Sequence, residues 1–363
     1  MCIGRMNFAS DNIMGASAPV LEALVRANAG PLPAYAADEI TKRIERRICE
    51  LFGREVATYL VATGTGANAL ALSAIVPPYG LAVCHREAHV IDDECGAPEF
   101  YMHGAKMAGL PGAGAKIEPA VLDAYLSGLP KHVKQMPPRG LSLSQATECG
   151  LVYTLPEIAA LAEVAHRHGL KVHMDGARFA NALVALGCTP AGMTWENGVD
   201  ILTFGATKNG CLAAEAVVVF DPEIAETMAW RRKRGGHLLS KGRLLAAQLE
   251  GYFANDHWLA NARHANAMAA RLSAGLTALP GVRLAWPTEA NEVFPILPRA
   301  LDAKLKSAGA VYHPWSELSL PESERVRPDE VLVRLVTAFA TAEEQVDAFL
   351  AAAREGTRRE AAE

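Results

Sequence analysis

Short apolar runs alternate with helical patterns through most of the first 220 residues of the chain. The run VATYLVA, residues 56–62, is rich in β-branched and aromatic side chains and predicts a buried strand. Residues 154–169 predict a helix that begins with a capping box of Thr154 and Glu157 and ends at Gly169. This alternation predicts an α/β sheet with helices on both faces. Further strands are expected at residues 170–178, 199–204 and 214–220.

The pattern changes beyond residue 240. Residues 244–279 are predicted to form one long helical stretch, and shorter strand-like pieces and a final helix at residues 342–356 follow it. We therefore expect two domains. The first is a large α/β domain, residues 1–244, and the second is a smaller C-terminal α+β domain, residues 245–363.

Composition limits the classes of function. The chain has 363 residues, half of them hydrophobic, and its formal net charge of −5 argues against a general nucleic-acid binder. The sequence has no run of about 18 apolar residues that would predict a membrane span. Its first residues lack the apolar core of a signal peptide. Seven cysteines without a C-x-x-C pair indicate reduced thiols, so we expect a cytoplasmic protein.

Several polar or glycine-rich groups fall at the ends of predicted strands, where ligands bind in α/β sheets. One is ATGTGAN, residues 62–68, in which Gly64 and Gly66 open a helix whose free N–H groups can bind phosphate. It matches neither the P-loop nor the G-x-G-x-x-G pattern. The alternative is a strand-to-helix turn that needs glycine only for its backbone angles.

Two charged side chains occupy similar positions. Asp175 ends a predicted strand and can pair with a protonated pyridine nitrogen, unless it only caps the next helix. Arg178 follows, where it could reach a phenolate or carboxylate of the same ligand. Lys208, in GATKNG, lies just past another strand. It either extends into solvent or acts as a nucleophile that forms a Schiff base.

The order of a phosphate loop, an aspartate and then a lysine resembles the fold-type I pyridoxal-phosphate enzymes. More of the chain is similar to one group of them. FASDN, YAADEIT, GTGAN, EAH, MDGARFANA, TKNG and VRLVT follow one another between about residues 7 and 350. Together these motifs resemble the low-specificity L-threonine aldolases of the β-eliminating lyase group. The resemblance implies a fold-type I, aminotransferase-like large domain and pyridoxal 5′-phosphate as the cofactor.

The resemblance also implies which residues hold that cofactor. Lys208 would carry it covalently, Asp175 would bind its pyridine nitrogen, and His89 would stack on the face of its ring. The phosphate would be bound by the start of the helix after the first strand. The residues there are Gly64, Thr65 and Gly66.

For the substrate, the resemblance implies that Ser10 and Arg334 hold the amino-acid carboxylate, and that Arg178 lies beside this carboxylate or the cofactor oxygen. His89 is the first candidate for the base that accepts the β-hydroxyl proton. The chain departs from the family at QATECG, where Glu148 stands in place of a histidine that many members carry. His89 and Glu148 are therefore both candidate catalytic residues.

Two other segments carry clustered charge. HREAH, residues 85–89, has two histidines four residues apart, but it lacks the H-E-x-x-H pattern and a third ligand, so we expect no metal. WRRKRGG, residues 230–236, is typical of a solvated or nucleic-acid-binding face. The resemblance implies instead that this segment reaches the cofactor phosphate of a neighbouring subunit. We expect a homodimer or homotetramer with shared active sites, and neither nucleic acid nor membrane as a partner.

The resemblance implies an aldolase that acts on L-threonine, L-allo-threonine or related β-hydroxy-α-amino acids such as phenylserine. Retro-aldol cleavage would yield glycine and an aldehyde. One alternative is a β-eliminating lyase or a transaminase on the same fold. A more distant alternative is a non-catalytic ligand-binding protein, against which the intact set of Lys208, Asp175 and the glycine loop argues.

Overall fold

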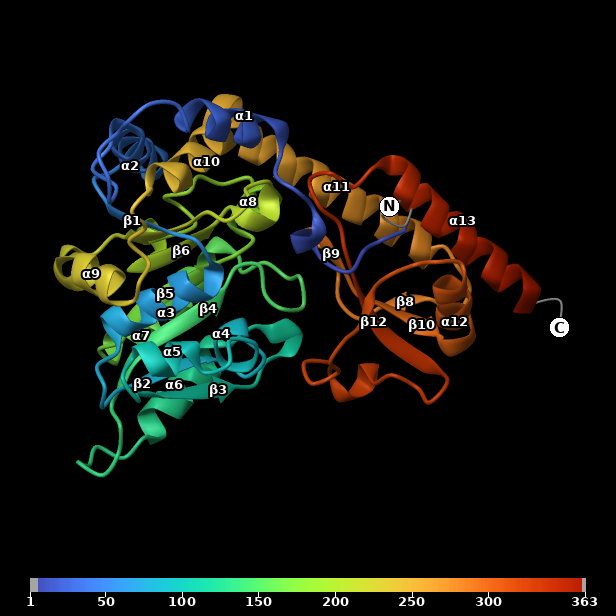
Figure 1. The fold of residues 1–363 in the computed structure, drawn as a ribbon. Coiled ribbons are helices and arrows are strands. Elements are labelled where there is room, and N and C mark those ends of the chain that lie inside the picture. The colour runs from blue at the N-terminus through green and yellow to red at the C-terminus, as the bar shows by residue number, and fades with distance from the viewer. Residues whose placement is uncertain (1–5, 361–363) are drawn as a thin grey trace.

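The computed structural model describes residues 6–360, which form two sheets with helices packed around them (Figure 1). The larger sheet has seven strands in the order β1-β7-β6-β5-β4-β2-β3. β7 runs antiparallel to its neighbours β1 and β6, and the other pairs are parallel. The strands are β1 (Ala57–Val61), β2 (Leu81–His85), β3 (Lys106–Leu110), β4 (Pro138–Ser144), β5 (Lys171–Gly176), β6 (Ile201–Gly205) and β7 (Glu215–Val219).

Helices cover both faces of this sheet because successive strand residues point to opposite sides. On one face, Ile201 and Val217 pack with α3, α5 and α9. On the other face, Leu202 and Val218 pack with helices that include α2, α7, α8 and α10. The predicted α/β sheet with helices on both faces is therefore confirmed. The helices are α1 (Ala18–Ala27), α2 (Glu39–Phe52), α3 (Gly64–Ile75), α4 (His89–Asp92), α5 (Ala97–Tyr101), α6 (Pro119–Gly128), α7 (Leu155–Arg167), α8 (Phe179–Leu186), α9 (Pro222–Arg234) and α10 (Arg243–Phe253).

The capped helix predicted near residue 154 is α7. The Thr154 side chain accepts from the Glu157 N–H, and the Glu157 side chain accepts from the Thr154 N–H, so both halves of the capping box are present. Gly169, with φ of 77°, follows the helix in the left-handed conformation that glycine adopts at little cost.

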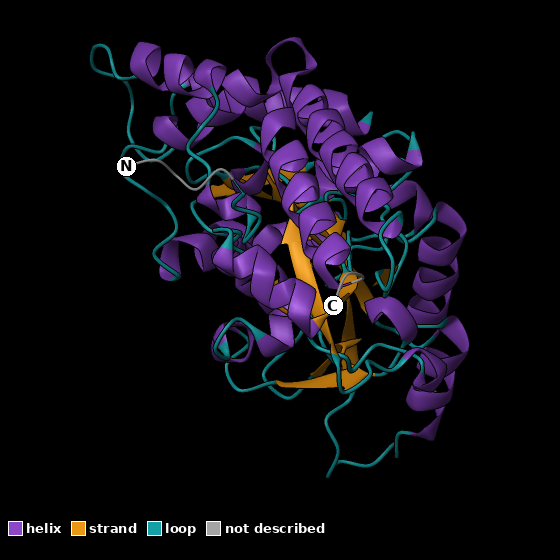
Figure 2. Cartoon of the chain, turned by 90° about the vertical axis from the view of Figure 1, so that its right-hand side faces the viewer, coloured by secondary structure: helices purple, strands orange, loops and turns teal. Residues whose placement is uncertain are grey.

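The C-terminal part of the chain forms a second, antiparallel sheet in the order β11-β12-β10-β8, with β9 paired to β12. Its core includes Leu272, Leu301, Val333 and Phe349, together with Phe8 from the N-terminal segment. The view turned by 90° shows the strands in the interior, with helices around them (Figure 2). The elements are α11 (His257–Thr277), β8 (Arg283–Leu284), β9 (Glu292–Val293), β10 (Pro295–Pro298), α12 (Arg299–Ser307), β11 (His313–Pro314), β12 (Glu330–Val336) and α13 (Glu343–Glu360).

The single long helical stretch predicted for residues 244–279 is wrong in one respect. α10 ends at Phe253 and α11 begins at His257, so the stretch is broken into two helices. Asn255 and Asp256 stand at the break with φ of 51° and 53°, in the left-handed region that Asn and Asp tolerate better than most residues. Short polar side chains thus end one helix where the apolar periodicity alone would continue it.

The predicted domain boundary at residues 244 and 245 falls at the start of α10, a helix that packs against α1 and α2. This boundary stays a prediction, and its outer limits, residues 1 and 363, lie outside the described residues. Within residues 6–360, no helix combines the length and the apolar character that crossing a bilayer requires.

Candidate active site

A cavity of about 450 Å³ opens at the carboxyl ends of β1, β4, β5 and β6. Parallel strands end at the same edge of a sheet, which is why residues far apart in the sequence meet there. Three residues predicted for the site, Ser10, Gly66 and Arg334, do not line this cavity. The predicted residues that do are Gly64, Thr65, His89, Glu148, Asp175, Arg178 and Lys208.

The start of α3 forms one wall of the cavity. Thr63 is the N-cap residue, and its hydroxyl oxygen accepts from the Gly66 N–H at 3.0 Å. A side chain at Gly66 would collide with a neighbour, because its Cβ would lie 2.4 Å from His237 Cε1. His237 is itself held by the hydroxyl of Tyr101, 3.0 Å from Nε2. A larger residue here would displace His237 or Thr63, and the first two N–H groups of α3, those of Gly64 and Thr65, remain available to an anion.

Asp175, at the end of β5, is buried and hydrogen-bonded through both oxygens. Oδ1 accepts from the Ala177 N–H at 3.0 Å, and Oδ2 accepts from the Asn68 amide at 2.8 Å. α8 begins at Phe179 and receives no side-chain cap, so Asp175 does not cap that helix. A buried carboxylate that faces a cavity can stabilise a cation there.

Lys208 follows β6 in a short 3-10 helix, Thr207–Asn209. Its side chain is partly buried and lines the cavity, so it does not extend only into solvent. The neighbouring Asn209 fixes this turn by donating to the Tyr252 hydroxyl and the Trp258 carbonyl, both at 2.8 Å. The lysine is thus presented to the cavity by a rigid turn.

A second carboxylate, Glu215 on β7, lies close to the lysine. Glu215 is buried, and its Oε2 accepts from the Ala206 N–H at 3.0 Å. Burial raises the pKa of Glu215 to about 7, although the positive charge of Lys208 acts in the opposite direction. This part of the cavity therefore contains an acid that exchanges its proton near neutral pH.

Arg178, which precedes α8, is held by two carboxylates. Its guanidinium donates to Asp11 through Nε at 2.9 Å and Nη2 at 3.1 Å, and Nη1 lies 3.3 Å from Glu292 Oε2. Arg334 Nη1 lies 3.9 Å from the other Glu292 oxygen, and its guanidinium lies 4.2 Å from the centre of the Trp315 ring. The two predicted arginines therefore approach the same carboxylate from opposite sheets.

Ser10 immediately precedes Asp11, one of the two carboxylates that bind Arg178. Its hydroxyl oxygen accepts from the Asn12 N–H at 3.1 Å and caps a 3-10 helix, Asp11–Ile13. The adjacent Asp11 is the residue that binds Arg178, and Asn12 lines the cavity. The N-terminal segment thus lines the cavity through Asn12, two residues after Ser10, the serine predicted to bind substrate.

His89, the first residue of α4, has partners on both its ring and its backbone. Its ring Nδ1 lies 2.8 Å from Glu94 Oε1, and its backbone N–H donates to Glu148 Oε1 at 2.7 Å. The pKa of His89 is raised, chiefly by the hydrogen bond to Glu94, against the opposing effect of burial. The negative charge of Asp175 acts in the same direction as Glu94.

Glu148 lies beside His89 and also accepts from the Ser144 hydroxyl at 2.9 Å. Burial, and then the negative charge of Asp175, raise the pKa of Glu148 to about 7. Glu148 therefore changes its protonation near neutral pH, where general acid–base catalysis is most effective, and the pKa of the neighbouring His89 is raised above its ordinary value.

The donors around the cavity fit pyridoxal phosphate. An amine, Lys208, a buried carboxylate, Asp175, and a helix start with free N–H groups line one space of suitable size. Asn68 Oδ1 and Glu94 Oε2 are buried without a hydrogen-bond partner among the described residues, and both side chains line the same cavity. A polar ligand would be expected in such a place.

Sequence reasoning missed several residues of the site. Asn68 lies within the quoted GTGAN motif, so its polar side chain at a helix start was a usable signal. Glu94 lies in DDECG, an acidic stretch typical of a surface loop, and Glu292 begins a short strand. Neither position carries a local signal of burial beside a histidine or an arginine.

His85, the other histidine of HREAH, does not line the cavity. His85 ends β2 and His89 begins α4, so the two histidines of HREAH do not share one helix, and His85 Nε2 lies 3.1 Å from the Gly112 carbonyl. Among residues 6–356, whose side chains the structure describes, there is no group of three or more His, Cys, Asp or Glu side chains that could hold a metal ion.

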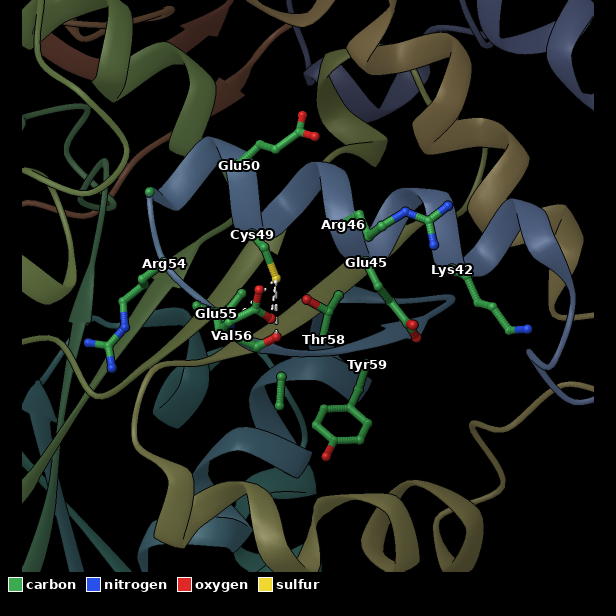
Figure 3. A pocket seen from close by; sticks show the side chains of 12 residues that line it. Lys42, Glu45, Arg46, Cys49, Glu50, Arg54, Glu55, Val56, Thr58 and Tyr59 are labelled. Atoms are coloured by element: carbon green, nitrogen blue, oxygen red, sulfur yellow. Dashed lines mark hydrogen bonds between the residues drawn. The ribbon is translucent and has the colours of Figure 1, made fainter.

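A larger groove of about 840 Å³ lies between α2 and β1 (Figure 3). Its lining mixes charges of both signs, including Lys42, Glu45 and Glu55, and contains none of the residues predicted for the site. The sulfur of Cys49 lies 3.6 Å from Glu55 Oε2, and burial raises the pKa of this thiol, which makes it a weak nucleophile. The groove therefore has no evident catalytic group.

Known proteins are similar to this chain over most of its length. The sequence profile of the beta-eliminating lyase family matches residues 7–298. A low specificity L-threonine aldolase of Pseudomonas sp. is 41% identical over 288 residues, 79% of this chain and 83% of that relative. The threonine aldolase of Leishmania major has the same fold, with a TM-score of 0.89, 27% identity and coverage of 96% of this chain and 99% of that one. A serine palmitoyltransferase solved with pyridoxal phosphate shares the fold at 16% identity, with a TM-score of 0.65 over 98% of this chain and 88% of that one. This chain therefore belongs to the beta-eliminating lyase family and is a pyridoxal-phosphate-dependent lyase.

Proposed function

We propose that this enzyme cleaves L-threonine, L-allo-threonine or a related β-hydroxy-α-amino acid, such as phenylserine, to glycine and an aldehyde. The convergence of Lys208, Asp175 and Arg178 on one cavity carries the proposal, because these side chains suit a cofactor and an amino-acid carboxylate. The similarity to relatives named as low specificity threonine aldolases supports the same reaction. Membership of a lyase family disfavours the non-catalytic alternative.

The cofactor would be held at three points. Lys208 Nζ would bind its aldehyde carbon, Asp175 would pair with its pyridine nitrogen, and the N–H groups of Gly64 and Thr65 would bind its phosphate, since the Gly66 N–H already donates to Thr63. When bound, pyridoxal phosphate supplies an electron-poor ring that accepts the electrons of the bond broken at Cα. The Asn68 amide and the Ala177 N–H each donate to one oxygen of Asp175, so the orientation of this buried carboxylate beside the cavity is fixed.

The substrate carboxylate would be bound by Arg178 and Arg334, with Ser10 nearby. Arg178 is already oriented by Asp11 and Glu292, so little conformational entropy is lost when an anion arrives. Arg334 is oriented by its contact with the Trp315 ring, and its Nε is buried without a partner among the described residues. An unsatisfied buried donor of this kind favours the binding of an anion.

The proton of the β-hydroxyl would pass to His89, directly or through one water molecule, as the Cα–Cβ bond breaks. Glu148 would orient that water or take over the role of the base, since its Oε1 already accepts from the His89 N–H. His89 would also lie against the face of the cofactor ring. Burial raises the pKa of Glu148 to about 7, and the hydrogen bond to Glu94 raises the pKa of His89.

A panel of threonine, allo-threonine, serine and phenylserine tests the reaction, with separate detection of glycine, aldehyde and ammonia. We expect glycine and aldehyde in equal amounts without ammonia, and loss of the reaction in Lys208→Ala. Ammonia release would favour a β-eliminating lyase, and transfer of the amino group to a keto acid would favour a transaminase. Either result would overturn the aldolase assignment.

The enzyme is further proposed to be a cytoplasmic homodimer or homotetramer with active sites shared between subunits. The basic segment, residues 230–236, ends α9 and exposes Trp230, which is 74% exposed and suited to a subunit contact. Mixing Lys208→Ala chains with chains whose basic segment is neutralised tests the shared site. Restored activity in the mixture is expected, and its absence would contradict sharing.

A further inference from the structure

Glu94 is a buried carboxylate whose described hydrogen-bond partners are two side chains of the cavity. Its side chain has no exposed surface, and Oε1 lies 2.8 Å from His89 Nδ1 and 2.8 Å from Asn68 Nδ2. The cost of burying a charge is large unless it is paired. A hydrogen on Nδ1 of the imidazole gives Oε1 a second hydrogen-bond donor beside the Asn68 amide.

The contact fixes which ring nitrogen of His89 carries hydrogen. An ionised carboxylate accepts hydrogen bonds and cannot donate them, so Nδ1 must be the donor. In the neutral ring the lone pair then belongs to Nε2. Since His89 lines the cavity, this tautomer leaves the other ring nitrogen free to accept a proton from a bound molecule.

The same carboxylate is connected to the site of the cofactor. The Asn68 amide donates to both Glu94 Oε1 and Asp175 Oδ2, each at 2.8 Å, so one side chain sets the distance between two acidic groups. The charge of Asp175 raises the pKa of His89, and the charge of Lys208 lowers it. Glu148 accepts a hydrogen bond from the backbone N–H of His89 and does not contact the ring in this way. Glu94 is the charged group in direct contact with the ring.

We propose that Glu94 is a positioning residue that fixes the orientation and the tautomer of His89, so that Nε2 accepts the proton of the substrate hydroxyl. In this role Glu94 acts through the ring of His89 and not directly on the substrate. It acts as the carboxylate does in a carboxylate–histidine pair, by holding Nδ1–H and stabilising the imidazolium that forms when Nε2 takes a proton. The catalytic part of the proposal rests on the proposed function of His89, whereas the effect on the ring does not.

The test compares Glu94→Gln with Asp93→Asn, a matched control that removes one negative charge from the exposed neighbouring residue. Gln keeps the shape and the acceptor oxygen and removes the charge. The first measurement is the rate of modification of His89 by diethylpyrocarbonate as a function of pH, followed by peptide mass spectrometry. The reagent attacks neutral imidazole, so the midpoint reports protonation of this ring without any need for activity.

In the holoenzyme and in the cofactor-free protein, we expect Glu94→Gln to move the His89 midpoint to lower pH, and Asp93→Asn to leave it unchanged. In wild type, the His89 midpoint should lie above 6.5, the ordinary pKa of histidine. The acid limb of kcat/KM should move in the same direction as the midpoint. kcat should fall about tenfold or more in Glu94→Gln, with little change in KM.

An unchanged His89 midpoint in Glu94→Gln would overturn the proposal, as would an equal shift in Asp93→Asn. If Glu94→Gln does not fold, a wild-type His89 midpoint at or below 6.5 would overturn it. A third outcome is that Glu94→Gln shifts the His89 midpoint while His89→Asn keeps its activity. The proposed effect of Glu94 on the His89 ring would then still hold. That result would instead remove His89 from the proposed function, so the two failures are distinguishable.

Discussion

The guanidinium of Arg178 binds the carboxylate of Asp11 as a bidentate ion pair, with Nε 2.9 Å from Oδ2 and Nη2 3.1 Å from Oδ1. The side chains are only 9% and 2% exposed. Paired guanidinium–carboxylate contacts of this geometry are among the stronger charge-assisted hydrogen bonds. The contact therefore joins the N-terminal segment to the start of α8.

Asp11→Asn should destabilise the protein by about 3–5 kcal/mol, the usual cost of removing one partner from a buried ion pair. Burial acts to raise the pKa of Asp11, but the charges of Arg178 and Lys208 outweigh it, so this pKa is lowered. The stabilisation should be complete above the ordinary pKa of aspartate and should disappear as the pH falls through the lowered value. Urea unfolding at several pH values measures both effects.

Glu22→Gln is the control for Asp11→Asn. Glu22 pairs with Arg26 at 4.0 Å on the surface, where both side chains are largely exposed. Its substitution should change stability little at any pH, because solvent screens such pairs. If both substitutions change the free energy of unfolding equally, the buried Asp11–Arg178 pair stabilises the protein no more than an exposed pair does.

Substitution of the two candidate bases should separate their roles. His89→Asn should lower kcat/KM by about 10²–10⁴-fold, the usual contribution of a general base, and Glu148→Gln should cost less, about tenfold. Wild-type kcat/KM should rise as the pH increases through about 7, because Glu148 loses its proton there. That component of the pH profile should be absent in Glu148→Gln.

Two outcomes would contradict the assignment of the base. A larger loss in Glu148→Gln than in His89→Asn would make Glu148 the base. Near wild-type rates in both variants would remove both residues from proton transfer. Circular dichroism and cofactor absorbance of each variant distinguish these results from loss of the fold.

Glu215→Gln should stabilise the cofactor-free protein at high pH. The pKa of Glu215 is raised to about 7 from the ordinary 4.5, so the native state binds its proton more strongly than the unfolded state. Stability is then lost as the pH rises between these values, at about 1.4 kcal/mol for each unit of pKa difference. Gln cannot ionise, so the free energy of unfolding of Glu215→Gln should increase relative to that of wild type by a few kcal/mol between pH 5 and pH 8.

Urea unfolding at pH 5 and pH 8 measures this gain. The control is Glu226→Gln, at an exposed position on α9, and it should show no comparable dependence on pH. If the difference between Glu215→Gln and wild type is the same at both pH values, Glu215 does not titrate in this interval.

Gly66→Ala should weaken the binding of pyridoxal phosphate. The added Cβ would lie 2.4 Å from His237 Cε1 and 2.9 Å from Thr63 Oγ1, so the start of α3 or His237 must move. We expect at least about a tenfold rise in Kd, or roughly 1.4 kcal/mol. The control is Gly128→Ala, at an exposed position with nothing within 4 Å of the Cβ, and it should leave the Kd unchanged. Absorbance titration of the cofactor-free protein measures both, and an unchanged Kd in Gly66→Ala would contradict the packing argument.

The residues at the strand ends of the large sheet could be predicted from the sequence. They depend on the local apolar pattern and on the rule that ligands bind at the carboxyl ends of parallel strands. Asp175 and Lys208 each follow an apolar run, and parallel strands bring such positions to one edge of the sheet. Thr154 and Glu157 likewise form a cap from residues three apart. In each case the information lies within a few residues of the feature.

The partners of these residues could not be predicted, because they are set by packing between distant elements. Glu94 is buried against Asn68 of α3 although its own neighbours Asp93 and Cys95 are exposed. Glu292 meets Arg178 only because the second sheet docks beside the first. The break at Asn255 was missed for another reason, since the apolar periodicity continues across it.

The two counter-charges of Arg178 come from opposite ends of the chain, Asp11 from the N-terminal segment and Glu292 from the second sheet. The groups proposed to hold the cofactor all lie between residues 62 and 208. A chain cut before β9 would therefore keep every residue proposed to hold the cofactor, but it would lack Arg334 and one of the two counter-charges of Arg178.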